Sequence, residues 1–275
     1  MRIRHYYPFN SSQKEILKFL DNRKVKYDCG EAITTFELFE DDTHFEKTKE
    51  FLELHDIHAT VVEAIYSQIE LNESKWLSCR SGWRYGYPQP NQENMGYRFT
   101  TYNSENYCIH CGKGLVQKES FVIKKEPNWG TRNFLMLNWV HDELFMTRKA
   151  ESLLEKANLT GFSSYAVLNT KGSNMEGVRQ IYVKKILEKG LSNEAISEVI
   201  VCPQCNFKKY MNKIGSVCYK KNTFENISDD IVKSQEKFGE ITCSSIIFVS
   251  QKFYKTVTEN KLNRGLIFEP VRLIP

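Results

Sequence analysis

Two pairs of cysteines with the same spacing constrain most strongly how this chain of 275 residues can fold. The first pair is Cys108 and Cys111, and the second pair is Cys202 and Cys205. Two residues between cysteines allow both thiolates to face one ion from a tight turn, and four thiolates complete a closed tetrahedral zinc site. We therefore expect the two pairs to meet around one structural Zn²⁺ ion.

The separation of the two pairs is unusual for a zinc ribbon. Ninety residues lie between Cys111 and Cys202, whereas a ribbon separates its pairs by about 15–20 residues. A redox-active pair, two separate metal sites and two disulfides therefore stay open as alternatives. His110 and Cys218 remain candidates for an additional metal ligand.

Composition and the N-terminal residues indicate the compartment. The chain is 41% hydrophobic and 26% charged, which is ordinary for a globular protein. No segment has the apolar length needed to span a bilayer, and the N-terminal residues lack the apolar segment of a signal peptide. We expect a cytoplasmic protein without membrane association, in which paired cysteines bind metal more often than they form disulfides.

The distribution of charge suggests two regions. Residues 1–100 carry 13 Lys and Arg against 16 Asp and Glu, or −3, whereas residues 101–275 carry 25 against 18, or +7. Apolar patterns in the first region predict strands near residues 1–9, 32–40 and 60–67, with helices starting after Ser11 or Ser12 and after Asp42 or Thr43. We therefore predict a mixed α/β region over residues 1–100 and a second domain over residues 101–275.

The second domain contains an internal repeat, with halves of about residues 101–170 and 195–275. Thr147 and Ser250 are N-cap residue types that open short amphipathic helices. Gly161 and Gly265 stand where each helix is expected to end with positive φ, before a strand. Each half also has one cysteine pair upstream. The predicted fold class is α+β, with a duplicated zinc-knuckle, helix and strand module after the N-terminal region.

Aromatic residues crowd residues 76–107 among glycines and prolines, which argue against long regular elements there. Trp83, Tyr85 and Tyr87 are the candidate partner-binding residues, because Trp and Tyr provide large contact areas at low entropic cost. Packing against one side of a core is the alternative role of these rings.

Lysines cluster beside the second cysteine pair and suggest a different function. Together with Phe207, Tyr210 and Tyr219, they suggest a zinc-ribbon nucleic-acid-binding protein, since lysines contact phosphates and aromatic rings stack on bases. The alternative is a solvated lysine-rich surface. The candidate nucleic-acid-binding residues are Lys208, Lys209, Lys213, Lys220 and Lys221.

Catalytic motifs are missing from the sequence. It contains no glycine-rich phosphate loop, His-Glu-x-x-His motif or nucleophile elbow. His141, Asp142 and Glu143 offer acid and base types in a row, but they lead directly into the first repeat and are interpreted as a turn or helix entry. We therefore expect a protein that is not an enzyme.

The arrangement of the cysteine pairs resembles a known family. Cys-x-x-Cys-Gly at residues 108–112 and Cys-x-x-Cys at 202–205 are similar to the double-CxxC proteins among immunity proteins of bacterial polymorphic toxin systems. The C-terminal pattern that ends in Phe268-Glu269-Pro270-Val271 is also similar, so the resemblance covers residues 100–275. Asn206 replaces the glycine after the second pair. The resemblance implies a non-enzymatic protein that neutralises a cognate toxin by binding it.

Overall fold

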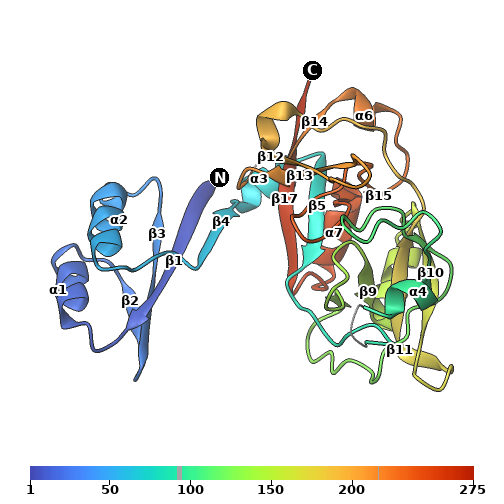
Figure 1. Ribbon diagram of the computed structural model, residues 1–275, viewed down its shortest axis with the longest axis horizontal. Helices are drawn as coiled ribbons and strands as arrows, with labels where there is room; N and C mark the ends of the chain where they lie inside the picture. Colours follow the sequence, from blue (N-terminus) through green and yellow to red (C-terminus); the bar gives the residue numbers. More distant parts are fainter. Residues whose placement is uncertain (92–94, 216) are drawn as a thin grey trace. The chain divides into compact units, whose positions relative to one another are not determined.

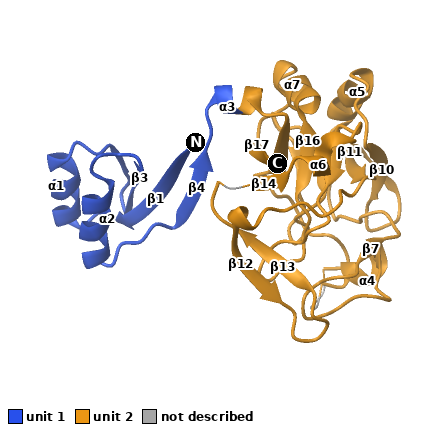
Figure 2. Ribbon diagram, turned by 90° about the horizontal axis from the view of Figure 1, so that it is seen from above, with its two compact units in different colours: residues 1–70 blue, residues 71–275 orange. Residues whose placement is uncertain are grey.

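The computed structural model describes residues 1–91, 95–215 and 217–275. It contains helices and mainly antiparallel sheets, which confirms the α+β class. The chain forms two compact units, residues 1–70 and residues 71–275 (Figures 1 and 2). Among the described residues, no helix combines the length and apolar character needed to cross a membrane.

Unit 1, residues 1–70, is a four-stranded antiparallel sheet with strand order β2-β3-β1-β4. Its elements are β1 (Arg2–Asn10), α1 (Lys14–Asn22), β2 (Tyr27–Cys29), β3 (Ile33–Phe39), α2 (Phe45–Leu54) and β4 (Val61–Ile65). This order of elements and strands is the ferredoxin-like, or split βαβ, topology. Leu20 of α1, Leu52 of α2 and Phe36 of β3 are buried together in the core between helices and sheet.

The two helices of unit 1 begin later than their sequence predicts. α1 starts after Gln13 and α2 starts after His44, both without a side-chain cap. Two of the four expected cap residues are engaged elsewhere: the Ser11 hydroxyl donates to a backbone carbonyl, and the Asp42 carboxylate accepts a hydrogen bond from Arg2. The predicted strands and helices themselves are present.

The units divide at residue 70 and not near residue 100. The reason is β5 (Trp76–Ser81), the central strand of a five-stranded sheet with order β14-β17-β5-β16-β15. It pairs antiparallel with β16 (Ile247–Ser250) and β17 (Leu266–Ile274). The aromatic-rich stretch thus begins with one short strand, in which Leu77, Cys79 and Ser81 are buried.

Unit 2, residues 71–275, also contains a four-stranded sheet with order β10-β11-β9-β8. In this sheet β9 precedes helix α5, β10 follows it, and both are antiparallel neighbours of β11. In the five-stranded sheet β16 precedes helix α7, β17 follows it, and both are antiparallel neighbours of β5. Unit 2 thus contains two equivalent groups of elements, one around each of these sheets. The first group consists of β8 (Phe134–Leu135), β9 (Leu144–Met146), α5 (Arg148–Lys156), β10 (Phe162–Leu168) and β11 (Asn174–Val183).

Helices α5 and α7 (Gln251–Glu259) begin where the sequence predicts. The Thr147 side chain accepts a hydrogen bond from the Ala150 amide, and the Ser250 side chain accepts one from the Phe253 amide. The glycines beyond the helices, Gly161 and Gly265, have φ of 89° and 86°. Both helices contribute to one hydrophobic core that also includes residues of both sheets.

The remaining elements are short. Two small hairpins carry the cysteine pairs, and the others connect the sheets. They are α3 (Gln68–Glu73), α4 (Tyr97–Thr101), β6 (Tyr102–Asn103), β7 (Val116–Gln117), the 3₁₀ turn η1 (Asn193–Ala195), β12 (Ile196–Val201), β13 (Lys208–Asn212), β14 (Val217–Lys220), α6 (Asn222–Glu225) and β15 (Ile231–Lys233).

Candidate metal centre

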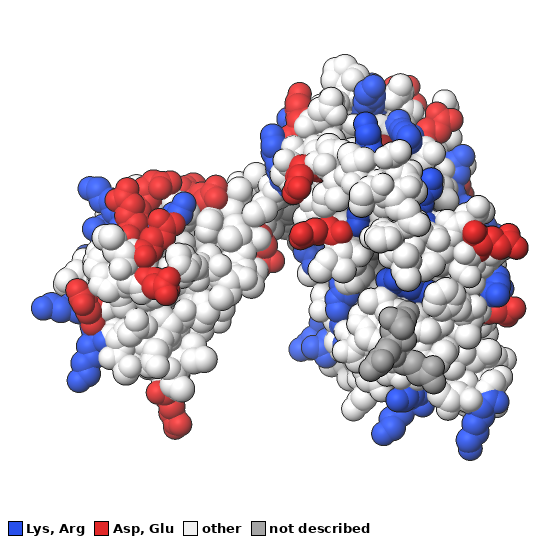
Figure 3. Space-filling view, in the orientation of Figure 1, with Lys and Arg blue, Asp and Glu red and all other residues white. Residues whose placement is uncertain are grey.

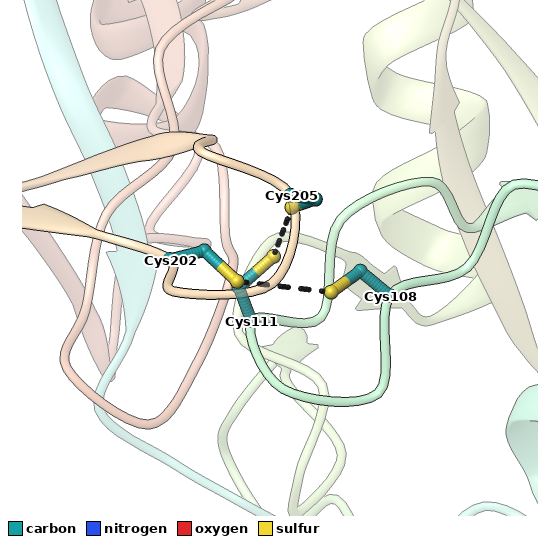
Figure 4. A group of neighbouring side chains, drawn as sticks. All are labelled: Cys108, Cys111, Cys202 and Cys205. Atoms are coloured by element: carbon teal, nitrogen blue, oxygen red, sulfur yellow. Dashed lines mark hydrogen bonds between the residues drawn. The ribbon is translucent and has the colours of Figure 1, made fainter.

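The four cysteines predicted as ligands lie together in unit 2, with their side chains directed toward one another (Figure 4). The sulfur atoms of Cys108 and Cys202 are 3.8 Å apart, those of Cys111 and Cys205 are 3.6 Å apart, and all four lie within 4.8 Å of one another. Zn–S bonds of about 2.3 Å in a tetrahedron place the sulfurs about 3.8 Å apart. The spacing therefore suits a four-coordinate metal ion.

Each cysteine pair sits on a turn with the same backbone hydrogen bonds. In the first turn the Cys108 amide donates to the Lys113 carbonyl at 2.9 Å, and the Gly112 amide donates to the Cys108 carbonyl at 2.8 Å. In the second, the amides of Cys202 and Asn206 make the equivalent bonds, both 2.9 Å long. Gly112 has φ of 81° and Asn206 has φ of 55°, so the residue after each cysteine pair is in the left-handed conformation.

The environments of the four thiols differ. Cys111 and Cys202 are 2% and 3% exposed, Cys108 is half-buried, and Cys205 is exposed. Burial raises the pKa of Cys111 to about 12, whereas backbone hydrogen bonds, first from Cys205, lower the pKa of Cys202 to about 6. Four thiolates this close repel one another, so a cation is needed to hold all of them ionised.

The two additional candidate ligands lie outside the group. Within the described residues, the only cluster of metal-binding side chains contains neither His110, which is exposed, nor Cys218, which is buried in β14. Cys243 approaches the site in another way: a Cβ atom on Gly112 would lie 3.0 Å from the Cys243 Cβ. Cys243 thus packs against the first turn.

The three candidate partner-binding aromatic residues have different surroundings. The Trp83 ring packs against Trp129 at 5.3 Å between centroids, and the Tyr85 hydroxyl donates to a backbone carbonyl. Both rings are half-buried against a hydrophobic core of unit 2. Tyr87 is 43% exposed and contacts Trp139. Trp83 and Tyr85 therefore pack against the core, and Tyr87 is the ring most available to solvent.

One of the lysines beside the second cysteine pair is not on the surface. Lys209 is 2% exposed, and its ammonium group donates to the carbonyls of Glu240 and Thr242, so it is not available to phosphates. Tyr219, considered for base stacking, is fully buried. The basic side chains visible on unit 2 in Figure 3 are dispersed over the face shown. The other candidate lysines, Lys208, Lys213, Lys220 and Lys221, are exposed.

A buried ion pair next to the cysteine group was not predicted. Lys233 and Glu143 are 9% and 6% exposed, and their charged atoms are 2.5 Å apart. Gln180, fully buried, donates to the second oxygen of Glu143 at 3.1 Å. These side chains lie at a cavity of about 230 Å³ that extends to the Gly112 turn. The residues come from three distant segments, so no local sequence signal identifies them.

His141 and Asp142, which precede Glu143 in the chain, were considered as acid and base candidates, and Asp142 also makes structural contacts. Asp142 accepts a hydrogen bond from the Ser245 amide at 3.0 Å and lies 3.7 Å from the Lys237 ammonium group. Burial lowers the pKa of His141, which favours the neutral imidazole. Both carboxylates therefore join the segment before β9 to the segments around β15 and β16.

Neither protein-family models nor the sequences of curated proteins match this chain.

Proposed function

We propose that this chain is a non-enzymatic, zinc-stabilised protein-binding protein, and that it acts as an immunity protein that neutralises a cognate bacterial toxin. The group of four cysteines carries this proposal. Four thiolates satisfy zinc completely and leave no coordination position for a substrate, so the ion stabilises the fold. The resemblance of residues 100–275 to double-CxxC immunity proteins supplies the class of partner.

Exposed apolar side chains beside the cysteine group support protein binding. Ile109, within the first cysteine turn, is 71% exposed, and Ile241, two residues before Cys243, is 86% exposed. Large apolar side chains at such exposure mark contact sites when they gather on one part of a surface. Cys243 packs against the first turn, which brings both segments to the same part of unit 2.

The proposal includes duplication of the metal-binding module. Its support comes from equivalent contacts in the two groups of elements. The Thr147 hydroxyl donates to Asn133, the residue before β8, and the Ser250 hydroxyl donates to Asp230, the residue before β15. With one cysteine turn upstream of each group, a bound zinc ion would join the two copies.

Metal analysis of the purified full chain tests the zinc site. We expect one tightly bound zinc ion per chain, which Cys111→Ser loses. Cys29→Ser is the matched control, because Cys29 is exposed in unit 1 and lies outside the cysteine group. A folded wild-type chain that binds no zinc would contradict the proposal.

Co-expression tests the toxin-binding function. We expect the wild-type chain to protect cells from the product of a neighbouring toxin-like gene. The double variant Ile109→Asp and Ile241→Asp should lose protection but keep its zinc. Leu54→Asp is the control, because Leu54 is 84% exposed in unit 1. Equal protection by all three chains would exclude this surface, and no protection by the wild type would exclude the function.

A further inference from the structure

The cavity of about 230 Å³ beside the first cysteine turn lies entirely within unit 2. Val116 and Ile186 border it and are 65% and 58% exposed, so the cavity opens to solvent. None of the four clustered cysteines borders the cavity. A zinc ion bound to the cysteines therefore leaves this space free for a different ligand.

The charged side chains that border the cavity are mostly cationic. Four of them carry a positive charge and two carry a negative charge, an excess of two positive charges. Both carboxylates already face a lysine, so the excess lies on the other cations. The cations are Arg98, Lys113, Lys233 and Lys237, and the carboxylates are Asp142 and Glu143.

Arg98 is a half-buried cation without a counter-ion. Within the described residues it has no carboxylate partner: its Nη1 atom donates to the Tyr107 hydroxyl at 2.6 Å, and its Nε atom is buried without an acceptor. An anion stabilises a desolvated guanidinium group, and a carboxylate can accept two parallel hydrogen bonds from it. The Tyr102 hydroxyl also borders the cavity, has no hydrogen-bond partner in the part of the chain that the structure describes, and can donate to the same anion.

The buried pair of Lys233 and Glu143 joins the two equivalent groups of elements, and it has an apolar counterpart. The Lys233 carbonyl accepts an amide from the segment after β11, and the Met136 carbonyl accepts the equivalent bond from the segment after β5. Glu143 stands directly before β9, and Ile246 stands directly before β16. Lys233 therefore corresponds to Met136, and Glu143 corresponds to Ile246.

The two counterparts belong to the hydrophobic packing of unit 2. Met136 is buried in one hydrophobic core, and Ile246 packs against another. Apolar residues thus suffice for packing at these positions, and a buried ion pair generally stabilises a fold no better than such residues do. The charges of Lys233 and Glu143 therefore serve a purpose other than packing. Lys233 donates to Glu143 with one of its three N–H groups and can donate to an anion in the cavity with another.

We propose that this cavity binds a small organic carboxylate, which accepts hydrogen bonds from Arg98, Lys233 and Tyr102. The rings of Tyr97 and Trp139, which also border the cavity, contact the apolar part of the ligand. The volume equals that of about eight water molecules in the liquid, so the ligand has a similar number of non-hydrogen atoms. Inorganic phosphate would leave the rings without an apolar partner, and a cation would be repelled by the excess positive charge.

An NMR titration of the full chain with three probes of the same shape tests the ligand class. Benzoate is negatively charged, benzamide is neutral and benzamidine is positively charged. We expect saturable amide shifts with benzoate and a Kd of about 1 mM or lower. Benzamide should bind at least about tenfold more weakly, because it loses the charge-assisted hydrogen bonds, and benzamidine should not bind. Inorganic phosphate should bind more weakly than benzoate.

Two variants test the residues that hold the carboxylate. Arg98→Gln should weaken benzoate binding at least about tenfold. Arg264→Gln removes the same charge from an exposed residue that does not border the cavity, and it should bind benzoate like the wild type. The double variant Lys233→Met and Glu143→Ile introduces the residues of the equivalent positions, so it should fold and also bind benzoate at least about tenfold more weakly.

The position of the shifts decides the question if the variants fail to fold. Benzoate should shift the wild-type amides of Arg98, Gln117 and Lys237. The amides of Ser78 and Cys79 in β5, outside this cavity, should stay unchanged. No saturable benzoate binding, equally tight binding of benzamide or benzamidine, tighter binding of phosphate, unchanged binding by Arg98→Gln, or shifts centred on β5 would each overturn the proposal.

Discussion

At the scale of single residues, the two cysteine turns share a backbone conformation but differ in the space available for a side chain. Gly112 and Asn206, which follow the second cysteine of each pair, both have positive φ. A Cβ atom on Gly112 meets Cys243, whereas Asn206 already carries a side chain in this conformation. The cost of positive φ for a residue other than glycine is about 1–2 kcal/mol.

Gly112→Ala should therefore destabilise unit 2 by about 1–2 kcal/mol, from strained φ and contact with Cys243. Asn206→Gly keeps the positive φ, which asparagine adopts at lower cost than alanine, and should change stability by less than about 0.5 kcal/mol. Denaturant unfolding followed by tryptophan fluorescence measures both. Equal losses of unfolding free energy in the two variants would show that neither the strained φ nor the contact with Cys243 determines the stability of the first turn.

The buried pair of Lys233 and Glu143 allows a second residue-scale prediction. Lys233→Met leaves the Glu143 carboxylate buried without its cation, which costs about 3–5 kcal/mol. Adding Glu143→Gln should restore much of this stability, because an amide side chain can still form a hydrogen bond with Gln180. Urea unfolding of both single variants and the double variant gives the coupling energy, and additive losses would exclude direct interaction.

The pH dependence of the Lys233→Met variant has a defined sign. Burial raises the pKa of Glu143 above that of an unfolded chain. Such a carboxyl group destabilises the folded state most when pH is above its folded pKa, and this effect fades as pH falls toward about 4.3. The difference in unfolding free energy between variant and wild type should therefore shrink on acidification. A difference that grows would show that the Glu143 carboxyl group does not have a raised pKa in the folded variant.

At the scale of elements, the predicted helix caps of unit 2 are confirmed because their hydrogen bonds are local. The side chains of Thr147 and Ser250 each accept a hydrogen bond from the backbone amide three residues ahead. The caps predicted for unit 1 are wrong because other partners compete for the same side chains. Short-range patterns thus locate a helix well but determine its first residue only where no long-range contact intervenes.

Thr147→Ala should destabilise unit 2 by about 1 kcal/mol through the loss of its cap. Ser250→Ala should cost more, about 2 kcal/mol, because the Ser250 hydroxyl also donates to the charged Asp230 carboxylate at 2.6 Å. The exchanges Thr147→Ser and Ser250→Thr keep both hydroxyl groups and serve as controls. Thermal unfolding ranks the variants, and a larger loss at Thr147 would contradict the expected order.

At the scale of the whole molecule, the two units differ in charge, and the group of four cysteines lies in only one of them. Residues 1–70 carry 9 Lys and Arg against 14 Asp and Glu, or −5, and residues 71–275 carry 29 against 20, or +9. Acidic side chains gather on the face of unit 1 visible in Figure 3. All four cysteines of the metal group lie in unit 2, and unit 1 has its own hydrophobic core.

Removal of zinc with a chelator should therefore lower the unfolding temperature of unit 2 and leave unit 1 folded. All four tryptophans lie in residues 71–275, so tryptophan fluorescence follows unit 2 alone. Amide signals of residues 1–70 in an NMR spectrum should persist under the same conditions. Simultaneous loss of both units would show that their folding is coupled.

The sequence by itself determined what depends on local spacing: the α+β class, both helices and three of the four strands of unit 1, the caps and terminal glycines of α5 and α7, and the four cysteines. Only the tertiary structure decided which distant segments meet. It placed β5 between β16 and β17, brought the cysteine turns together across 90 residues, and buried Lys233 against Glu143. Local patterns reflect backbone propensity and side-chain periodicity, whereas these contacts depend on how the whole chain excludes water from its core.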